Sequence, residues 1–141
     1  MKEKEEEKKI ELRPIGYVEN AYFEPGYKEE VFQKISKIVL KAEFAKGLFR
    51  LDDFEKLYIL FHFSKSGGYK MVQRRRYDGK LSGVFACRSP HRPNGIGLTL
   101  VKLLKIEGNV LYVKGLDAIN KTPVLDIKPY IKKSKEKPES K

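Results

Sequence analysis

Residues 98–115 read LTLVKLLKIEGNVLYVKG, and they carry the clearest structural pattern in this chain. Two apolar runs, residues 98–106 and 110–115, flank the tripeptide Glu-Gly-Asn. Glycine adopts left-handed backbone conformations at little cost, and tight hairpin turns require such a conformation. The stretch therefore predicts two antiparallel strands joined by a short turn.

Further short apolar runs, separated by Gly, Pro and Asp, precede this hairpin, a pattern typical of strands joined by turns. The expected strands cover residues 10–20, 38–44, 56–63, 70–76 and 83–86. Only residues 47–56 have the pattern of a short helix. A doubly wound α/β fold would need long amphipathic helices between its strands, and the sequence has none. We predict an all-β, single-domain barrel of short strands with little helix.

The strand at residues 56–63 contains LYILFHF, which is apolar on both faces apart from His62. Such a run is typical of a strand buried within a sheet. Buried polar side chains are normally hydrogen-bonded, so we expect a structural role for His62.

The chain has 141 residues, enough for one domain with its own hydrophobic core. Its single cysteine, Cys87, cannot form an internal disulfide, and we expect a buried structural thiol. There is no signal-peptide pattern and no run of about 18 apolar residues, so we expect a soluble, cytoplasmic protein outside the membrane. One cysteine and two histidines are too few for a zinc site, and we expect no metal.

Both ends of the chain are charged and poor in apolar residues. Such segments bury too little apolar surface to offset the entropy lost on ordering. We therefore expect disordered tails at residues 1–9 and 132–141, on either side of one folded barrel domain at residues 10–131.

The formal net charge of +11 is concentrated in one part of the sequence. Residues 2–9 are neutral and residues 132–141 carry +3, which leaves +8 for the core. Residues 65–92 contain eight basic residues and one acid, Asp78, and so hold +7 of that charge. A localised basic segment favours a polyanionic partner, nucleic acid above all.

Arg74, Arg75 and Arg76 are the densest part of this basic segment. Strand alternation places the first and third on one face and the second on the other. Tyr69 and Tyr77 flank them and are able to stack on exposed bases. The arginines either contact RNA phosphates or protect an exposed sheet edge, and the sequence leaves both interpretations open.

The loop at residues 88–98, RSPHRPNGIGL, combines two Pro, two Gly, two Arg, one His and one Asn. Proline fixes its own backbone angles and glycine permits angles that other residues avoid, so the loop presents its cations from a backbone with few conformations. We predict a rigid polar loop that holds a ligand.

Two other polar, turn-rich segments follow expected strands: SKSGG at residues 64–68 and LDAINKTPVLDIKPY at residues 116–130. The second offers a carboxylate, an amide, an amine and a hydroxyl in close succession, which suits a small polar ligand. An Asx turn that closes the barrel is the alternative. No serine lies in a nucleophile-elbow pattern, which disfavours a hydrolase, and we expect Asp52 and Asp53 only to cap a helix or turn.

Four motifs, in this order, resemble the TsaA-like, or TrmO, family: IGYVEN at residues 15–20, LYILFHFSK at 57–65, GVFACRSPHRPNGIGL at 83–98 and LDAINKTPVLDIKPY at 116–130. The resemblance covers nearly the whole expected core. It implies an S-adenosylmethionine-dependent methyltransferase that methylates the exocyclic amine of a threonylcarbamoylated adenosine beside the tRNA anticodon. It also implies a β-barrel unlike Rossmann methyltransferases, and a homodimer with the donor near the subunit interface.

Carried over by motif, the resemblance assigns donor binding to Tyr27, Lys28, Glu29, Ser64, Lys65, Arg88, Leu98, Asp117, Ala118, Ile119, Asn120, Lys121 and Thr122. Methyl transfer from a sulfonium needs neither a metal nor a covalent intermediate, because positioning of donor and acceptor supplies much of the acceleration. The amine loses a proton, for which Asp117, Asn120 or a backbone carbonyl is a suitable acceptor. We predict that RNA contacts come from Arg74, Arg75, Arg76, His91 and Arg92.

The sequence departs from the family pattern at three places in these motifs, one of which is Ser64-Lys65, where bacterial members have His-Gln. Gly95 stands where the family commonly has proline, and Asn120-Lys121 stand where it commonly has Asp-Gly. These changes favour an alternative function, a noncatalytic RNA-binding or assembly module that keeps the barrel without the donor. A third possibility is a donor-dependent enzyme that modifies a small molecule or a protein.

Overall fold

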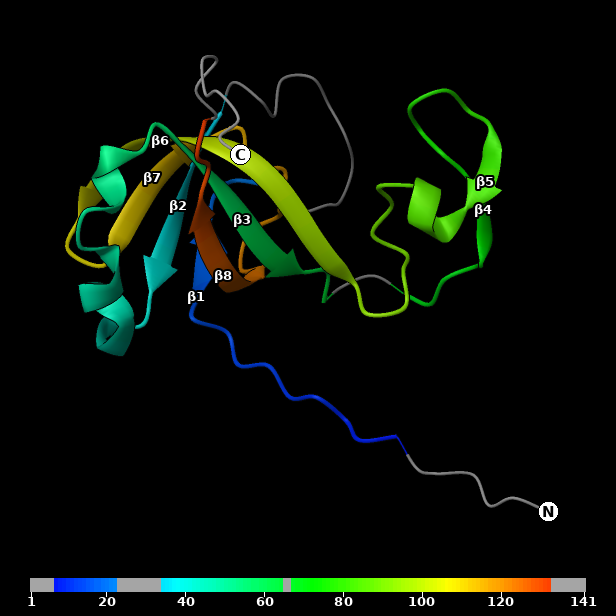
Figure 1. Cartoon of the computed structure of the whole chain (residues 1–141), viewed down its shortest axis with the longest axis horizontal. Coiled ribbons are helices and arrows are strands. Elements are labelled where there is room, and N and C mark those ends of the chain that lie inside the picture. The colour runs from blue at the N-terminus through cyan, green and yellow to red at the C-terminus, as the bar shows by residue number, and fades with distance from the viewer. Residues whose placement is uncertain (1–6, 23–33, 65–66, 133–141) are drawn as a thin grey trace, which may run out of the picture.

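A computed structural model gives the fold and describes residues 7–22, 34–64 and 67–132. Six strands close into an antiparallel barrel (Figure 1). In order around the barrel they are β1 (Gly16–Glu19), β2 (Ile35–Leu40), β7 (Val110–Lys114), β6 (Ile96–Glu107), β3 (Lys56–His62) and β8 (Pro123–Pro129). β8 pairs with β1 and closes the circle. The predicted all-β barrel is confirmed.

Alternate residues of these strands point inward and form one apolar core. Ile38, Leu57, Ile59, Leu111 and Val113 are fully buried. Burial of each such side chain contributes about 1.5–3 kcal/mol relative to leaving it exposed. The core therefore lies inside the barrel and holds all six strands against one another.

The hairpin of β6 and β7 is confirmed, with a tighter turn than the sequence indicated. Glu107 pairs with Val110, so only Gly108 and Asn109 form the turn. Gly108 has φ +61°, the left-handed value that a two-residue hairpin turn needs at its first position. The Asn109 side-chain amide donates to the Leu40 carbonyl at 2.6 Å, which fixes the turn to β2.

The described part of the chain contains three short 3₁₀ helices: η2 (Ala42–Leu48), η3 (Leu51–Asp53) and η4 (Val84–Ala86). None of the helices in these described residues is long and apolar enough to cross a membrane. The expected helix at residues 47–56 overlaps the end of η2 at residues 47–48 and all of η3, and its other residues are not helical. The expected strand at residues 38–44 is wrong at both ends, because β2 begins at Ile35 and the chain turns into η2 after Leu40.

Two further strand predictions need correction. The expected strand at residues 10–20 shortens to β1, and residues 83–86 form η4 after β5 (Leu81–Gly83) ends. The helix turns Val84 and Cys87 inward, where both are buried, and the Val84 amide donates to the Met71 carbonyl at 2.8 Å. The predicted structural burial of Cys87 is therefore confirmed.

The strand predictions missed β8 entirely, because its residues lie in a segment that was interpreted as polar and turn-rich. Its two prolines disfavour an interior strand position, but Pro123 is the first residue of β8 and Pro129 the last. At strand ends, proline removes no essential ladder hydrogen bond. Val124 and Ile127, which lie between the prolines, pack into or against the core.

β4 (Val72–Arg74) and β5 pair with each other outside the barrel. Together with η4 they form a small hairpin unit that stands apart from the barrel in Figure 1. We call residues 69–86 the arm. The strand expected at residues 70–76 is thus only three residues long, because Arg74, its last residue, donates to the Gly79 carbonyl and Arg75 pairs with Asp78, so the chain turns there.

Candidate functional site

Strand register gathers several distant segments at one end of the barrel. Phe61 pairs with Val124, His62 pairs with Ile96, and Tyr17 pairs with Pro123. The end of β1, the end of β3, the start of β6 and the segment before β8 therefore meet there. We call this end of the barrel, with residues 20–22, 64, 95–99 and 116–122, the site end.

Arg88 and Leu98, from opposite ends of the proline- and glycine-rich loop, are joined directly. Arg88 Nη2 donates to the Leu98 carbonyl oxygen at 2.5 Å. The loop is therefore closed by its own first residue, and the guanidinium lies where β6 begins. The loop that the sequence predicted to be rigid is thus held closed by a hydrogen bond between its first and last residues.

Asp117 is tied to the same stretch of β6. Thr99 Oγ1 donates to Asp117 Oδ1 at 2.6 Å, and Thr99 is buried while Asp117 is exposed. A carboxylate held by a buried hydroxyl is oriented yet open to solvent. Two hydrogen bonds and the Leu98–Thr99 peptide unit thus link three residues that are predicted to bind the methyl donor: Arg88, Leu98 and Asp117.

Asn20 fixes the turn that contains most of the other residues predicted to bind the methyl donor. Its Nδ2 donates to the Ala118 carbonyl and to Ser36 Oγ, both at 2.9 Å. Its backbone N–H donates to Asn120 Oδ1 at 2.9 Å, and the Asn120 N–H donates to the Tyr22 carbonyl at 2.7 Å. Asn120 therefore holds the turn to the end of β1 through its side-chain oxygen and its backbone.

Lys121 and Thr122 complete this turn. Lys121 has φ +73°, a left-handed conformation that glycine adopts more easily, and its N–H donates to the Val18 carbonyl at 2.7 Å. Thr122 Oγ1 donates to the Ile119 carbonyl at 2.7 Å and is buried. The turn therefore exposes Asp117 and Lys121 to solvent, while the hydroxyl of Thr122 is buried and hydrogen-bonded.

Ser64 lies at the end of β3, next to the last residues of the loop. Its N–H donates to the His62 carbonyl at 2.9 Å, and the Phe63 N–H donates to the Gly95 carbonyl at 2.7 Å. Gly95 has φ +60°, which proline cannot adopt, so this chain has a local backbone suited to glycine at that position. His62 is half-buried, and a Cβ atom added at Gly95 would lie 3.5 Å from its Nε2.

The predicted donor residues Tyr27, Lys28, Glu29 and Lys65 lie outside the described residues. Ser64, Arg88, Leu98 and the turn from Asp117 to Thr122 are brought together at the site end. Sequence reasoning missed Asn20, Ser36 and Thr99. A detectable signal was present only for Asn20, a polar residue that ends an alternating strand.

His91 and Arg92 connect the loop to its surroundings. His91 Nδ1 lies 3.2 Å from the Gly68 carbonyl oxygen, and the His91 carbonyl accepts from Gln73 of the arm at 2.8 Å. Arg92 Nη1 donates to the Cys87 carbonyl at 2.6 Å. The His91 carbonyl therefore ties the loop to the arm, while Arg92 ties the loop to Cys87.

The three arginines of the arm differ in their surroundings. Arg75 forms a bidentate pair with Asp78, at 2.8 and 2.9 Å, and this hydrogen-bonded pairing lowers the pKa of Asp78 to about 2 and raises the pKa of Arg75. Arg74 Nη1 donates to the Gly79 carbonyl at 3.1 Å, and both Arg74 and Arg76 are exposed. One arginine therefore closes the turn, while two present their side chains at the surface.

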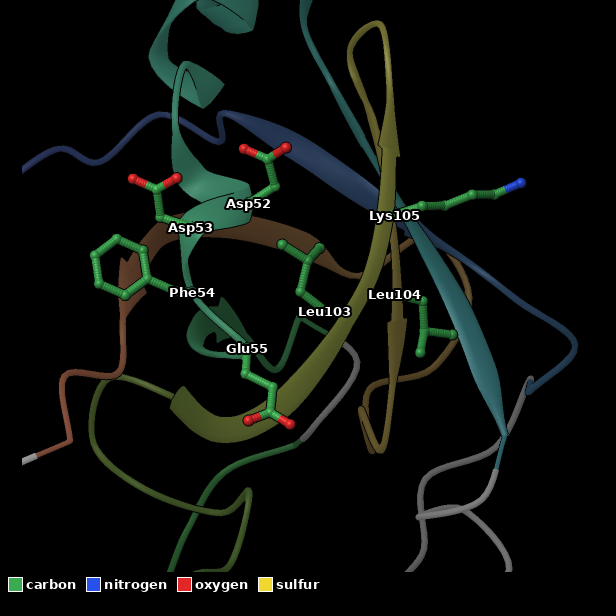
Figure 2. A pocket seen from close by; sticks show the side chains of 7 residues that line it. All are labelled: Asp52, Asp53, Phe54, Glu55, Leu103, Leu104 and Lys105. Atoms are coloured by element: carbon green, nitrogen blue, oxygen red, sulfur yellow. The ribbon is translucent and has the colours of Figure 1, made fainter.

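A pocket of about 320 Å³ lies elsewhere on the barrel (Figure 2). It lies between η3 and the bulged part of β6, and its lining residues are Asp52, Asp53, Phe54, Glu55, Leu103, Leu104 and Lys105. The Lys105 side chain points away from Asp52 and Asp53 in this view. None of the predicted donor residues that the structure describes lines this pocket. Asp52 and Asp53 belong to η3 itself, and Asp53 pairs with Arg50 at 2.8 Å.

Residues 24–136 match a family described as the tRNA-methyltransferase O N-terminal domain. This chain belongs to that family. Solved structures agree with this assignment of the tRNA-methyltransferase O domain. TrmO from Pseudomonas aeruginosa is 31% identical, with a TM-score of 0.72 over 88% of this chain and 57% of that chain. The predicted family and its barrel are therefore confirmed.

Relatives of this tRNA-methyltransferase O domain are found in mammals and archaea. A tRNA (adenine(37)-N6)-methyltransferase of Rattus norvegicus is 45% identical over 130 residues, which are 84% of this chain and 30% of that protein. The Homo sapiens protein of the same name is 42% identical over 84% of this chain and 29% of its own length. The chain thus spans less than a third of these two relatives. An S-adenosyl-L-methionine-binding protein of Archaeoglobus fulgidus is 34% identical over 84% of this chain and 88% of its own length.

Proposed function

We propose that this protein binds S-adenosylmethionine at the site end and methylates tRNA. The acceptor is the exocyclic amine of the adenosine next to the anticodon, in its threonylcarbamoylated form. One observation carries the proposal: residues predicted separately as donor contacts, Arg88, Leu98 and Asp117, converge through two short hydrogen bonds. The name of the mammalian relative supports N6 of adenine 37 in tRNA as the acceptor, and the name of the archaeal relative supports the donor.

The charges at the site end fit the donor. S-adenosylmethionine carries a sulfonium, an ammonium and a carboxylate, so it needs both a negative and a positive partner. Asp117 supplies an exposed carboxylate whose orientation is fixed by Thr99, and Arg88 supplies a guanidinium at the start of β6. Charge-assisted hydrogen bonds of this kind are roughly twice as strong as neutral ones.

The donor would supply a methyl group from its sulfonium. In the reaction the sulfur–methyl bond breaks, a nitrogen–methyl bond forms, and the amine loses one proton. We propose that Asp117 accepts this proton, because its carboxylate is exposed and oriented. Asn120 Oδ1 already accepts the Asn20 N–H, so its role in our proposal is to position the turn.

The arm and the loop are the proposed RNA contacts. Arg74 and Arg76 present exposed cations, and His91, which belongs to the same basic segment, is also exposed. Arg75 and Arg92 also face the RNA in this proposal, and they additionally fix the arm turn and the loop. Phosphate contacts from these residues would position the anticodon loop over the site end.

We also propose a cytoplasmic homodimer. The outer face of β6 carries Ile96, Leu98 and Leu100, which are 40–45% exposed and lie beside the proposed donor site. A second copy that covers this apolar strip would shield the donor from water. Sedimentation velocity tests it: we expect a dimer, and Leu100→Lys should shift the population to monomer.

Donor binding and product formation test the proposed function. Calorimetric titration with S-adenosylmethionine should give saturable binding, and Asp117→Asn should weaken it at least tenfold. Asp52→Asn is the matched control, since Asp52 is an exposed carboxylate that belongs to the other pocket. Mass spectrometry of nucleosides should then find one new methyl group in tRNA incubated with protein and donor.

Absence of donor binding at high micromolar concentration would refute the enzyme proposal. If tRNA still binds under those conditions, the noncatalytic RNA-binding module is the remaining function. Donor binding with methylation of a protein or small molecule, and none of tRNA, would instead refute the proposed acceptor.

A further inference from the structure

Three lysines lie side by side across the outer surface of the barrel. In the strand register, Lys56 of β3 pairs with Lys102 of β6, and Lys102 pairs with Lys114 of β7. Directly opposed residues of antiparallel strands have their Cβ atoms about 4.5–5.5 Å apart. We call Lys56, Lys102 and Lys114 the lysine row.

The lysine row has no acidic partners in the described part of the chain. The ion pairs found there involve other cations; Lys105, for example, pairs with Glu107 at 3.3 Å. Like charges directly opposite each other destabilise a sheet. The arrangement therefore disfavours the folded protein unless something else neutralises it.

Protection of a sheet edge does not account for the lysine row. Lysines often lie on edge strands, where they prevent pairing with another chain. At the lysine row the strands have no free edge, because Lys102 pairs with both Lys56 and Lys114. Lys114 also pairs with Ile35 of β2, and the Lys56 carbonyl accepts the Tyr130 N–H. Surface lysines that serve only solubility are normally interspersed with acids. Neither ordinary structural reason applies to a row of three.

The neighbouring row extends this cationic surface. Lys37 and Lys105 lie on either side of Tyr112, with their ammonium nitrogens 5.5 and 4.5 Å from the ring centroid. Cation–π contacts of this length fix the position of a lysine side chain without neutralising it. The aromatic ring thus holds two lysines next to the lysine row; Lys105 is also paired with Glu107, and Lys37 forms no ion pair within the described residues.

We infer that the lysine row is a second contact surface for the phosphate backbone of the RNA substrate, separate from the arm. The inference rests on the proposed function for the identity of the RNA. A regular row of cations on a rigid sheet suits a regularly charged polymer, because each phosphate contact releases counterions from the nucleic acid.

The position of the lysine row agrees with a large substrate. β6 leads from the loop beside the arm to the far side of the barrel (Figure 1). Lys102 lies six positions after Ile96, or roughly 20 Å along an extended strand. A tRNA that places its anticodon loop at the site end is long enough to reach both surfaces, whereas a free nucleotide is not.

The test compares RNA binding of charge-neutral variants over a range of salt concentrations. The variant Lys56→Gln, Lys102→Gln, Lys114→Gln should lower tRNA affinity roughly tenfold or more near 0.1 M salt and reduce the slope of log K against log salt by about 2–3. The control Lys9→Gln, Lys41→Gln, Lys46→Gln removes the same net charge from exposed positions outside the row and should change affinity less than threefold. Replacement of the row by arginine should keep the native slope.

Several results would overturn the inference. They are an unchanged salt slope in the lysine-row variant, an equal loss in the control, or binding of the row to anionic phosphatidylserine vesicles with no effect on tRNA. Thermal unfolding should show the variant at least as stable as the native protein, so a loss of affinity cannot reflect misfolding. Titration with S-adenosylmethionine separates the two proposals. If the native protein binds no donor, the proposed methyltransferase function is refuted. The salt dependence of tRNA binding still tests whether the lysine row contacts RNA.

Discussion

Replacement of Lys121 by glycine should stabilise the protein. Lys121 has φ +73°, which costs an L-residue about 1–2 kcal/mol, while glycine loses about 0.5–1 kcal/mol more backbone entropy on folding than other residues. The side chain is exposed, and the hydrogen bond from its N–H to the Val18 carbonyl at 2.7 Å needs only the backbone. The difference predicts that Lys121→Gly raises the free energy of unfolding by about 0.5–1 kcal/mol.

Urea denaturation and thermal unfolding measure this effect. For a domain of this size, the predicted gain corresponds to a rise in Tm of roughly 2–4 °C. Lys121→Ala is the control, because alanine removes the same charge and side chain but keeps the Cβ atom that disfavours positive φ. We expect it to lie within about 0.5 kcal/mol of the native protein.

A stability of Lys121→Gly equal to that of Lys121→Ala would refute the reasoning, since the gain would then come from the lost charge. A destabilised glycine variant would refute it as well. Arg50 provides an independent check. It is the other non-glycine residue with positive φ in the described part of the chain, at 68°, and its replacement by glycine sacrifices the pair with Asp53. Its gain should therefore be smaller.

Two more predictions follow from the fold. Gly97→Ala should destabilise the protein by about 1–3 kcal/mol in urea denaturation, because the new Cβ would lie 2.6 Å from the buried Phe61 ring, whereas Gly47→Ala, with nothing within 4 Å, should be near neutral. The Asp78 carboxyl should titrate with a pKa of about 2 in an NMR titration, below its ordinary 3.8, because Arg75 pairs with the ionised form. The pairing is therefore complete above about pH 4 and is lost as the pH falls through 2; a midpoint near 3.8 would mean that the pair does not form in solution.

Local patterns were sufficient to predict the barrel strands with strong apolar signals. The β6–β7 hairpin needs only alternation and one glycine, and β3 needs only a continuous apolar run. β8 could not be predicted in the same way, because its strand character depends on pairing with β1 and β3, and its terminal prolines resemble turn residues.

The candidate site was predicted in outline because its motifs are contiguous in sequence. Its supporting contacts were not, since Asn20 and Asn120 lie 100 residues apart and Thr99 and Asp117 lie 18 apart. The lysine row was equally hidden. Its members come from three strands, and a count of charge along the chain assigns almost all the excess to residues 65–92.

The turn at residues 116–122 explains how this chain tolerates Asn-Lys where the family commonly has Asp-Gly. Asn120 contributes an oxygen that accepts the Asn20 N–H, which a carboxylate oxygen would do equally well, and Lys121 contributes a backbone N–H. The shape of the turn is therefore kept while its charge changes, by one negative charge lost and one positive charge gained. Asp117 is then the one carboxylate left in a turn that we propose holds a cationic donor. Loss of that carboxylate should accordingly cost more donor affinity in this chain than in a relative that has Asp-Gly.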